Sequence, residues 1–326
     1  MHSVLGRFFK SAKVMTKLND ISGQTVDQRR PESKILQFYS ANRNIGNYTP
    51  VLGIHRMLGK ELDVWSIRRT PVDWDYVHRN YQEVIVGGAG LLHRVFEPFW
   101  VDLEKNCRLP ITVWGIGVCL PESDPIKGVS QGVVRSVFDR AKLANVRDEL
   151  TRDFYKLDSN ISITACPTLE YVASEFAVSP KENLTGDVLH SWHTKLEPGE
   201  DGPLIKKAIK KAGYRYSVTE NIETPKESLP EILEMYPESD FVVTTRLHGA
   251  IIAYAFQRPY IAISYDPKIV AFQELYGGGV CLKDVRDLGR TIESGDFREL
   301  GDYSLELKRV REFGRKAKAA LDKSLS

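Results

Sequence analysis

The chain has 326 residues, of which 42% are hydrophobic and 27% are charged, a composition typical of a soluble globular protein with room for two domains. The formal net charge of +2 gives no electrostatic indication of nucleic-acid binding, so nucleic acid is not expected as a partner. The cysteines are widely spaced and form no Cys-x-x-Cys pair, which favours reduced, buried thiols in a cytoplasmic protein over a metal site or a disulfide framework.

The first predicted element is a basic amphipathic helix over residues 1–18, "MHSVLGRFFKSAKVMTKL". Apolar side chains, including Phe8 and Phe9, fall on one face, and basic side chains cover the other. Such a helix can lie in a membrane interface with anionic headgroups, as a peripheral contact at the inner membrane face; the alternatives are a helix packed on its own domain or a frayed leader. No stretch reaches the roughly 18 apolar residues of a membrane span. The polar residues 19–33 are predicted to be a linker, which completes a first region over residues 1–33.

The second region, residues 34–178, alternates between predicted strands and helices. A strand in "KILQFYS" leads through an asparagine-rich loop, residues 42–48, into a helical pattern. Further strands are predicted in "LDVWSI", "EVIVGGAGLL" and "PITVWGIGV", the last two ending in the glycine turns Gly87–Gly90 and Gly115–Gly117. This alternation predicts a parallel sheet that helices cover on both faces.

The same alternation recurs over residues 179–294, beginning with a strand and loop in "GDVLHSWH". The tail, residues 295–326, has the pattern of an amphipathic helix that packs back across the domains. The predicted fold class is therefore α/β, with two Rossmann-like doubly wound domains and a cleft between them. In such sheets ligands bind outside the carboxyl ends of the strands, so the loops after the strands are the candidate functional segments.

The stretch "DFVVTTRLHGAIIAYAF" places polar residues where a buried strand should end. Arg246 offers a planar, permanently charged group suited to carboxylate or phosphate, and His248 can move a proton near neutral pH. The following helix is expected to begin near Gly249, where free backbone amides also favour an anion. The pattern indicates a site for an anionic substrate that undergoes proton transfer; the structural alternative is an arginine ion pair and a capping histidine.

Two further cations follow predicted strands. In "SYDPK", Asp266 fits a helix N-cap and Pro267 the first helical position, whereas Lys268 opposes the helix dipole. A nearby anionic ligand would explain Lys268, and so would simple exposure to solvent. Arg147 in "VRDELTRDF" likewise follows an apolar stretch, and it indicates either an anion or an internal ion pair.

The glycine-rich turns containing Gly88, Gly90 and Gly117 have neither G-x-G-x-x-G nor Walker spacing. They indicate close backbone packing or the approach of a ligand to the cleft. His93, just beyond the first of these turns, is interpreted as a structural residue.

Taken in order, Asn44-x-Gly46 after the first strand, "VIVGGAGLL", "VWGIGV", "VRDELTRDF" and "TTRLHGAIIAYAFQRPYIAISYDPKIVAF" resemble the polysaccharide pyruvyl transferase family. The resemblance covers most of the chain, and Arg-Leu-His followed by Ser-Tyr-Asp-Pro-Lys is its most specific part. It implies a GT-B-like arrangement of the two domains. It also implies transfer of the pyruvyl group of phosphoenolpyruvate onto a sugar as a ketal, with release of phosphate.

By the same resemblance, Arg147, Arg246, Leu247 and His248 match the family's donor-binding residues, and Lys268 is added to this donor site. The acceptor is expected to be a sugar or a lipid-linked oligosaccharide of an exopolysaccharide, capsule or cell-wall glycan, with phosphoenolpyruvate as co-substrate and no further cofactor or metal. Two positions depart from the family pattern: Asn47 replaces an aspartate, and Cys166 precedes Pro167 where Asp-Pro is usual. Neither position is therefore assigned to catalysis.

Ketal formation requires a proton on the enol carbon of phosphoenolpyruvate, and His248 is the hypothesised general acid. The cleft loops with Asn44, Gly46, Gly88, Gly90 and Gly117 are expected to surround the donor. Two other functions remain open: a GT-B glycosyltransferase that uses a nucleotide sugar, and a non-catalytic glycan-binding protein with the same fold.

Overall fold

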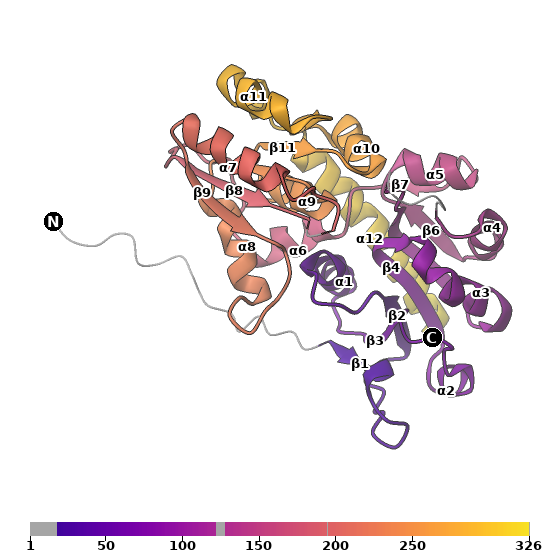
Figure 1. The fold of residues 1–326 in the computed structure, drawn as a ribbon. Coiled ribbons are helices and arrows are strands. Elements are labelled where there is room, and N and C mark those ends of the chain that lie inside the picture. Colours follow the sequence, from indigo (N-terminus) through magenta and orange to yellow (C-terminus); the bar gives the residue numbers. More distant parts are fainter. Residues whose placement is uncertain (1–17, 122–127, 194, 326) are drawn as a thin grey trace.

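The computed structural model describes residues 18–121, 128–193 and 195–325, which form two parallel sheets flanked by helices (Figure 1). The predicted amphipathic helix falls on residues that lie outside this part of the chain. Within the described residues, no helix combines the length and apolar character that crossing a bilayer requires.

The N-terminal sheet has seven strands in the order β1-β3-β2-β4-β5-β6-β7, all paired in parallel. Its strands are β1 (Asn19–Asp20), β2 (Ile35–Tyr39), β3 (Asp63–Ser66), β4 (Glu83–Leu92), β5 (Ile111–Val118), β6 (Leu143–Val146) and β7 (Ser162–Ile163). The helices that follow these strands are α1 (Ile45–Leu58), α2 (Trp74–Asn80), α3 (Glu97–Asn106), α4 (Gln131–Asp139), α5 (Glu149–Tyr155) and α6 (Thr168–Glu175).

The C-terminal sheet has five parallel strands in the order β12-β11-β10-β8-β9. Its strands are β8 (Asp187–Ser191), β9 (Arg215–Thr219), β10 (Phe241–Thr244), β11 (Tyr260–Ile263) and β12 (Gly279–Leu282). Its helices are α7 (Asp201–Lys211), α8 (Leu229–Glu238), α9 (Leu247–Ala255), α10 (Pro267–Tyr276) and α11 (Leu288–Ser294), and the tail forms α12 (Tyr303–Leu325). The domain boundary predicted near residue 179 falls between the last strand of the first sheet and the first strand of the second.

Strand β4 shows why both faces of the N-terminal sheet are apolar. Val84 and Val86 pack into a cluster that includes Trp100 of α3, whereas Ile85 belongs to a separate cluster on the other face. Alternate side chains of a strand point to opposite faces, so a sheet covered on both sides needs an uninterrupted apolar run. The predicted doubly wound α/β fold is confirmed by this arrangement.

Helix α12 packs across both domains, as its amphipathic pattern predicts (Figure 1). Phe313 contacts Trp114 of β5 with ring centroids 5.3 Å apart, and Ala317 and Leu321 belong to the same cluster on the N-terminal sheet. Val310 instead lies in the core cluster that contains α9 of the C-terminal domain. The helix therefore ties the two domains together by burying apolar surface on each.

Three local expectations were wrong. Residues 19–33 are not a plain linker, because Asn19–Asp20 forms the edge strand β1 and Ile21 is fully buried. Strand β4 does not end in the turn Gly87–Gly90 but continues to Leu92 through an irregular register, and β5 likewise runs past Gly117 to Val118. Helix α9 begins at Leu247, two residues earlier than predicted, so Arg-Leu-His is the start of a helix and not a separate turn.

Candidate functional site

A cavity of about 410 Å³ lies between the two domains at the carboxyl ends of their strands. Ser40, Cys119 and Arg147 on its lining directly follow β2, β5 and β6, and Arg246 and Asp266 lie in the loops after β10 and β11, so both sheets contribute to it. The structure brings seven of the predicted site residues into this one cavity: Asn44, Gly90, Arg147, Arg246, Leu247, His248 and Lys268. Gly46, Gly88 and Gly117 are not on its lining and lie behind it.

Arg147 follows β6 directly and is only 3% exposed. Its Nε donates to the Asp148 carboxylate at 3.2 Å and its Nη2 donates to the Val118 carbonyl at 3.3 Å. Its Nη1 is buried and has no hydrogen-bond partner among the residues that the structure describes. A buried guanidinium nitrogen left unpaired is costly, so this atom marks a place where an anionic ligand would be bound favourably.

Gly117 makes room for this arginine. A Cβ at position 117 would lie 2.1 Å from Arg147 Nε, closer than any side-chain atom can approach. Asp148, in turn, caps α5 by accepting from Thr151 N at 2.8 Å. Gly117 therefore allows Arg147 to pack against β5, and does not itself line the cavity.

His248 occupies the first turn of α9, and its Nε2 is buried without a hydrogen-bond partner. Burial is the largest influence on the ring, and the cations Arg147, Lys268 and Arg246 add to it, so the pKa of His248 lies well below its usual 6.5. The imidazole is consequently neutral at pH 7 when the cavity holds no anion. A bound anion would act in the opposite direction and raise this pKa.

Two other cations come from the C-terminal domain. Arg246, 6% exposed, is the N-cap of α9, and its Nε donates to the Trp192 carbonyl. Lys268 Nζ lies 2.7 Å from the Asp266 carboxylate, which caps α10 through Lys268 N at 3.2 Å. Asp266 therefore has its predicted N-cap role, and its carboxylate stabilises Lys268 in a helical turn that ordinarily disfavours a cation. Asp266 also accepts from Leu120 N at 3.4 Å, which links the two domains.

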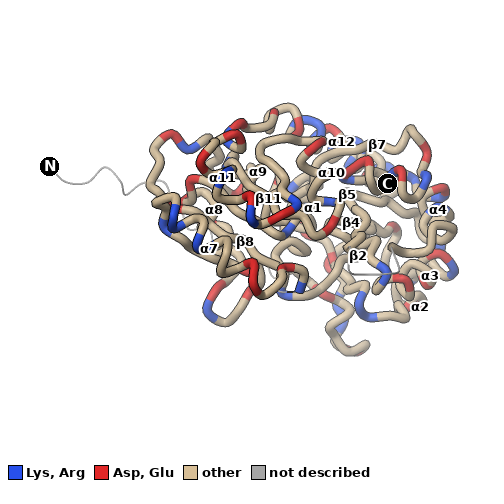
Figure 2. The backbone as a smooth tube through the Cα atoms, turned by 45° about the horizontal axis from the view of Figure 1, so that its top comes forward, with Lys and Arg blue, Asp and Glu red and all other residues tan. Residues whose placement is uncertain are grey.

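The cavity is much more positive than the whole protein. In the described part of the chain, five Lys and Arg side chains line the cavity, against the carboxylate of Asp266: Arg68, Arg147, Lys195, Arg246 and Lys268. Elsewhere acidic and basic residues are interspersed along both halves of the chain (Figure 2), and the net charge is only +2. The clustering of Lys and Arg is therefore a local feature of this cavity. Among the residues that the structure describes, no group of three His, Cys, Asp or Glu side chains is placed to hold a metal ion.

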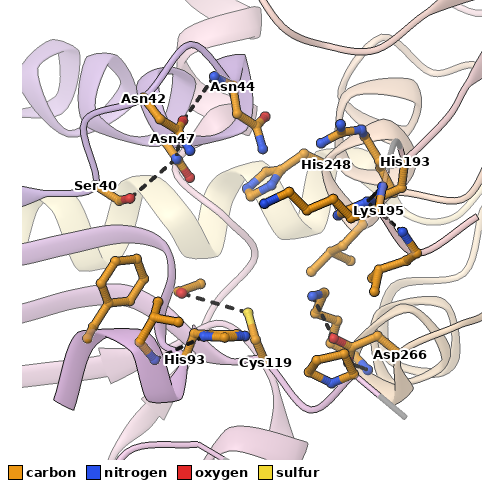
Figure 3. Close-up of a pocket in the computed structure, with 18 of the residues that line it drawn as sticks. Ser40, Asn42, Asn44, Asn47, His93, Cys119, His193, Lys195, His248 and Asp266 are labelled. Carbon is orange, nitrogen blue, oxygen red and sulfur yellow. Dashed lines mark hydrogen bonds and ion pairs between the residues drawn. The ribbon is translucent and has the colours of Figure 1, made fainter. Parts of the chain in front are cut away.

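The opposite wall of the cavity is rich in amides (Figure 3), and Arg68 donates to its Ser40 Oγ at 3.0 Å. Asn47 Nδ2 donates to Asn42 Oδ1 at 2.6 Å and lies 3.5 Å from Ser40 Oγ, while Asn44 caps α1 by accepting from Gly46 N at 3.0 Å. Figure 3 shows these asparagines facing His248 and His193 across the cavity. Asn47 therefore adds no carboxylate to this wall.

Several lining residues were not predicted from the sequence. His193 follows β8, and the cavity also includes Arg68, Phe96, Lys195 and Cys119. His93, interpreted as structural, lines the cavity as well, and its Nδ1 accepts from Val95 N at 3.1 Å. The signal that could have found His193 is the rule already applied to Arg246, because β8 pairs with β10 and both strands end at the same edge.

The two predicted glycines of β4, Gly88 and Gly90, are positions of close packing. A Cβ at Gly88 would lie 2.6 Å from Pro50 of α1, and one at Gly90 would lie 2.4 Å from Cys119 Sγ. Cys166 is buried, contacts Thr168 Oγ1 at 3.3 Å and does not line the cavity, so it takes no direct part in the site. All four cysteines are free thiols, two of them buried and two half-buried.

Two Rossmann-like domains that share a cavity at their strand ends define a GT-B-like α/β protein, and solved structures agree. The Staphylococcus aureus MnaA–UDP structure matches with a TM-score of 0.53 and 13% identity over 80% of this chain and 87% of that one. The Methanocaldococcus jannaschii UDP-GlcNAc 2-epimerase matches with a TM-score of 0.51 and 9% identity over 83% and 95%. At these identities the similarity establishes the fold alone.

The family follows from the sequence itself. The model of the polysaccharide pyruvyl transferase family matches residues 25–267, and the chain belongs to that family of transferases. No curated protein matches the chain. The matched span contains Arg147, Arg246 and His248 and ends at Pro267, one residue before Lys268.

Proposed function

We propose that this protein transfers the pyruvyl group of phosphoenolpyruvate onto two hydroxyls of a sugar, which forms a cyclic ketal and releases phosphate. The observation that carries the proposal is the unpartnered Nη1 of Arg147, buried in a cavity that Arg246 and Lys268 also line. Phosphoenolpyruvate carries a carboxylate and a phosphate, and two arginines from two domains suit these two groups.

The reaction begins with transfer of a proton to the methylene carbon C3, which leaves an oxocarbenium-like centre at C2. One sugar hydroxyl adds to C2 and loses its proton. The bond between C2 and the phosphate oxygen then breaks, phosphate departs, and the second hydroxyl adds to C2 and loses its proton. The cations around the donor stabilise the carboxylate throughout and the departing phosphate at the end.

His248 is the proposed general acid, and its environment sets a condition on that role. The ring is neutral in the cavity without a ligand because burial and three cations lower its pKa. The negative charges of phosphoenolpyruvate offset those cations, so binding of the donor raises the pKa and allows the ring to take up the proton it later transfers. The acid is thereby formed only when the donor is present.

The amide wall is the proposed place for the acceptor sugar. Asparagine side chains both donate and accept hydrogen bonds, as sugar hydroxyls do, and the wall carries none of the cations that the donor requires. A lipid-linked oligosaccharide or another precursor of an exopolysaccharide, capsule or cell-wall glycan is the acceptor class proposed. The cavity of about 410 Å³ is at the small end of the roughly 300–1,000 Å³ of ligand pockets, which suits a small donor and the end of a glycan chain.

The direct test incubates the purified protein and phosphoenolpyruvate with a panel of glycosides, and measures phosphate release and product mass. The expected product gains the mass of pyruvate less one water. A parallel panel of nucleotide sugars addresses the GT-B glycosyltransferase alternative. Glycosyl transfer from a nucleotide sugar, without phosphate release from phosphoenolpyruvate, would refute the proposal.

A further inference from the structure

The segment that follows β8 contributes His193, Lys195 and Leu196 to the lining of the cavity. The backbone of this segment is fixed, because His193 N donates to Thr245 Oγ1 at 2.7 Å and Thr245 Oγ1 donates to Glu197 Oε2 at 2.8 Å. Thr245 directly follows β10, next to Arg246. The position of the His193 ring is therefore set by the same strand end that positions the donor-binding arginine.

The hydrogen bonds of the ring define its tautomer. His193 Nδ1 accepts from Lys195 N and from Leu196 N, each at 3.2 Å. A ring nitrogen that accepts backbone N–H groups carries no proton, so in the neutral imidazole the proton is on Nε2. Burial, followed by the charges of Arg246 and Lys268, lowers the pKa of His193 to about 4 and keeps the ring neutral.

Among residues 18–121, 128–193 and 195–325, Nε2 of His193 makes no hydrogen bond. The ring nevertheless lines the cavity on the same side as His248 (Figure 3). An N–H group close to Arg246 and Lys268 can therefore donate to an anion that enters the cavity.

We propose that His193 is a donor-binding residue whose Nε2–H group donates a hydrogen bond to an anionic oxygen of phosphoenolpyruvate held by Arg246 and Lys268. This role rests on the proposed function and extends it to a residue in a different segment of the chain. His193 differs from His248 in having no free ring nitrogen to accept a proton, so it binds the donor without taking part in proton transfer. Because its ring is neutral, His193 adds a hydrogen-bond donor to the anion site without adding positive charge.

The test compares two substitutions of His193, one that keeps the contact made by Nδ1 and one that keeps an N–H group near Nε2. His193→Asn retains an oxygen near the position of Nδ1, which can accept from Lys195 N and Leu196 N, but it does not reach the position of Nε2. His193→Gln retains an N–H group near Nε2 and loses the contact with the loop. Binding of phosphoenolpyruvate and of inorganic phosphate to the full chain is measured by titration calorimetry.

We expect phosphoenolpyruvate to bind roughly 10-fold or more weakly to the Asn variant, as for a lost hydrogen bond to a charged group, and nearly normally to the Gln variant. Unchanged affinity of the Asn variant for phosphoenolpyruvate, or equal losses of affinity in the Asn and Gln variants, would overturn the role of His193. Either result would mean that the Nε2–H group does not bind phosphoenolpyruvate. If the wild-type protein binds neither phosphoenolpyruvate nor phosphate, the proposed function itself fails.

A second measurement does not depend on the variants. Nitrogen-15 NMR of the wild-type protein should show His193 as a neutral ring protonated on Nε2 at pH 7, both before and after phosphoenolpyruvate is added. A proton on Nδ1, or an imidazolium, would contradict the assignment whatever the variants bind.

Discussion

Gly46 at the start of α1 faces the imidazole of His248 at the start of α9, and a Cβ at position 46 would lie 2.3 Å from Cγ of that ring. The two helices belong to different domains and are joined in one apolar cluster that includes Ile45 and Ile251. The Asn-x-Gly motif therefore has a physical reason in this chain. Only a residue without a side chain lets the N-terminal domain close against His248.

Gly46→Ala should displace the ring of His248 and lower turnover by roughly 100-fold, because small misplacements of a reacting group are costly. The fold should persist, since the ring can shift into the adjoining cavity. Gly132→Ala is the matched control, because Gly132 is a helical glycine with no heavy atom within 4 Å of an added Cβ. Steady-state kinetics with phosphoenolpyruvate would check the pair, and equal activity of the two variants would contradict the prediction.

Arg147→Lys should weaken phosphoenolpyruvate binding by roughly 10-fold or more, because an ammonium group cannot hold Asp148, the Val118 carbonyl and a ligand in the same planar geometry. The conservative replacement of an exposed arginine, Arg215→Lys, serves as control, since that side chain is 69% exposed. The measurement is titration calorimetry. Wild-type affinity in Arg147→Lys would remove this arginine from the donor site.

His248→Gln and His248→Ala should both lower turnover by on the order of 100-fold or more, because an amide can hydrogen-bond but cannot protonate carbon. Binding of phosphoenolpyruvate to the wild type at pH 7 should also take up protons, since the donor raises the lowered pKa of His248. Calorimetry in buffers of different ionisation enthalpy measures this uptake, which should shrink in His248→Gln. Near-normal turnover in the Gln variant would mean that the ring only orients the donor.

Stability should fall as pH decreases from about 6.5 to about 4, because His193 has a pKa of about 4 in the folded protein and an ordinary value of 6.5 when unfolded. In that window the unfolded chain binds more protons than the folded one, so acid favours unfolding, by at most about 1.4 kcal/mol per pH unit for each such group. Urea unfolding of wild type and His193→Asn at pH 7 and pH 5 isolates this contribution. The variant should lose less stability, and identical losses would argue against a lowered pKa.

A truncation that begins at Leu18 tests the predicted amphipathic segment and keeps strand β1 intact. If the segment binds membranes, Phe8 and Phe9 would each contribute at most about 1.5–3 kcal/mol, and each basic residue about 1 kcal/mol on an anionic surface. The full chain should therefore sediment with anionic vesicles at low salt, and the truncated chain should remain folded and stay in solution. Failure of the full chain to bind, or unfolding of the truncation, would rule out the membrane role.

Local patterns in the sequence determined the order of the elements and the positions of Arg147, Arg246 and Lys268 after strands. This is possible because a buried parallel strand requires an uninterrupted apolar run, and a charge ends that run within a residue or two. The N-cap at Asp266 could be predicted for the same reason, since capping depends on neighbours along the chain. The glycines in β4 and β5 misled the prediction of strand ends, because their purpose is contact with Pro50, Cys119 and Arg147, which are distant in sequence.

What the tertiary structure alone decided is the chemistry of the cavity. The lowered pKa of His248 results from burial, from Arg147 and Lys268, which follow other strands, and from Arg246, two residues before it, and no local pattern reports the distances to Arg147 and Lys268. The tautomer of His193 depends on the contacts of its Nδ1 with Lys195 N and Leu196 N, and the approach of Gly46 to His248 depends on how the two domains meet. Strand and helix formation is governed by short-range periodicity, whereas charge interaction and steric fit act through space between segments that folding brings together.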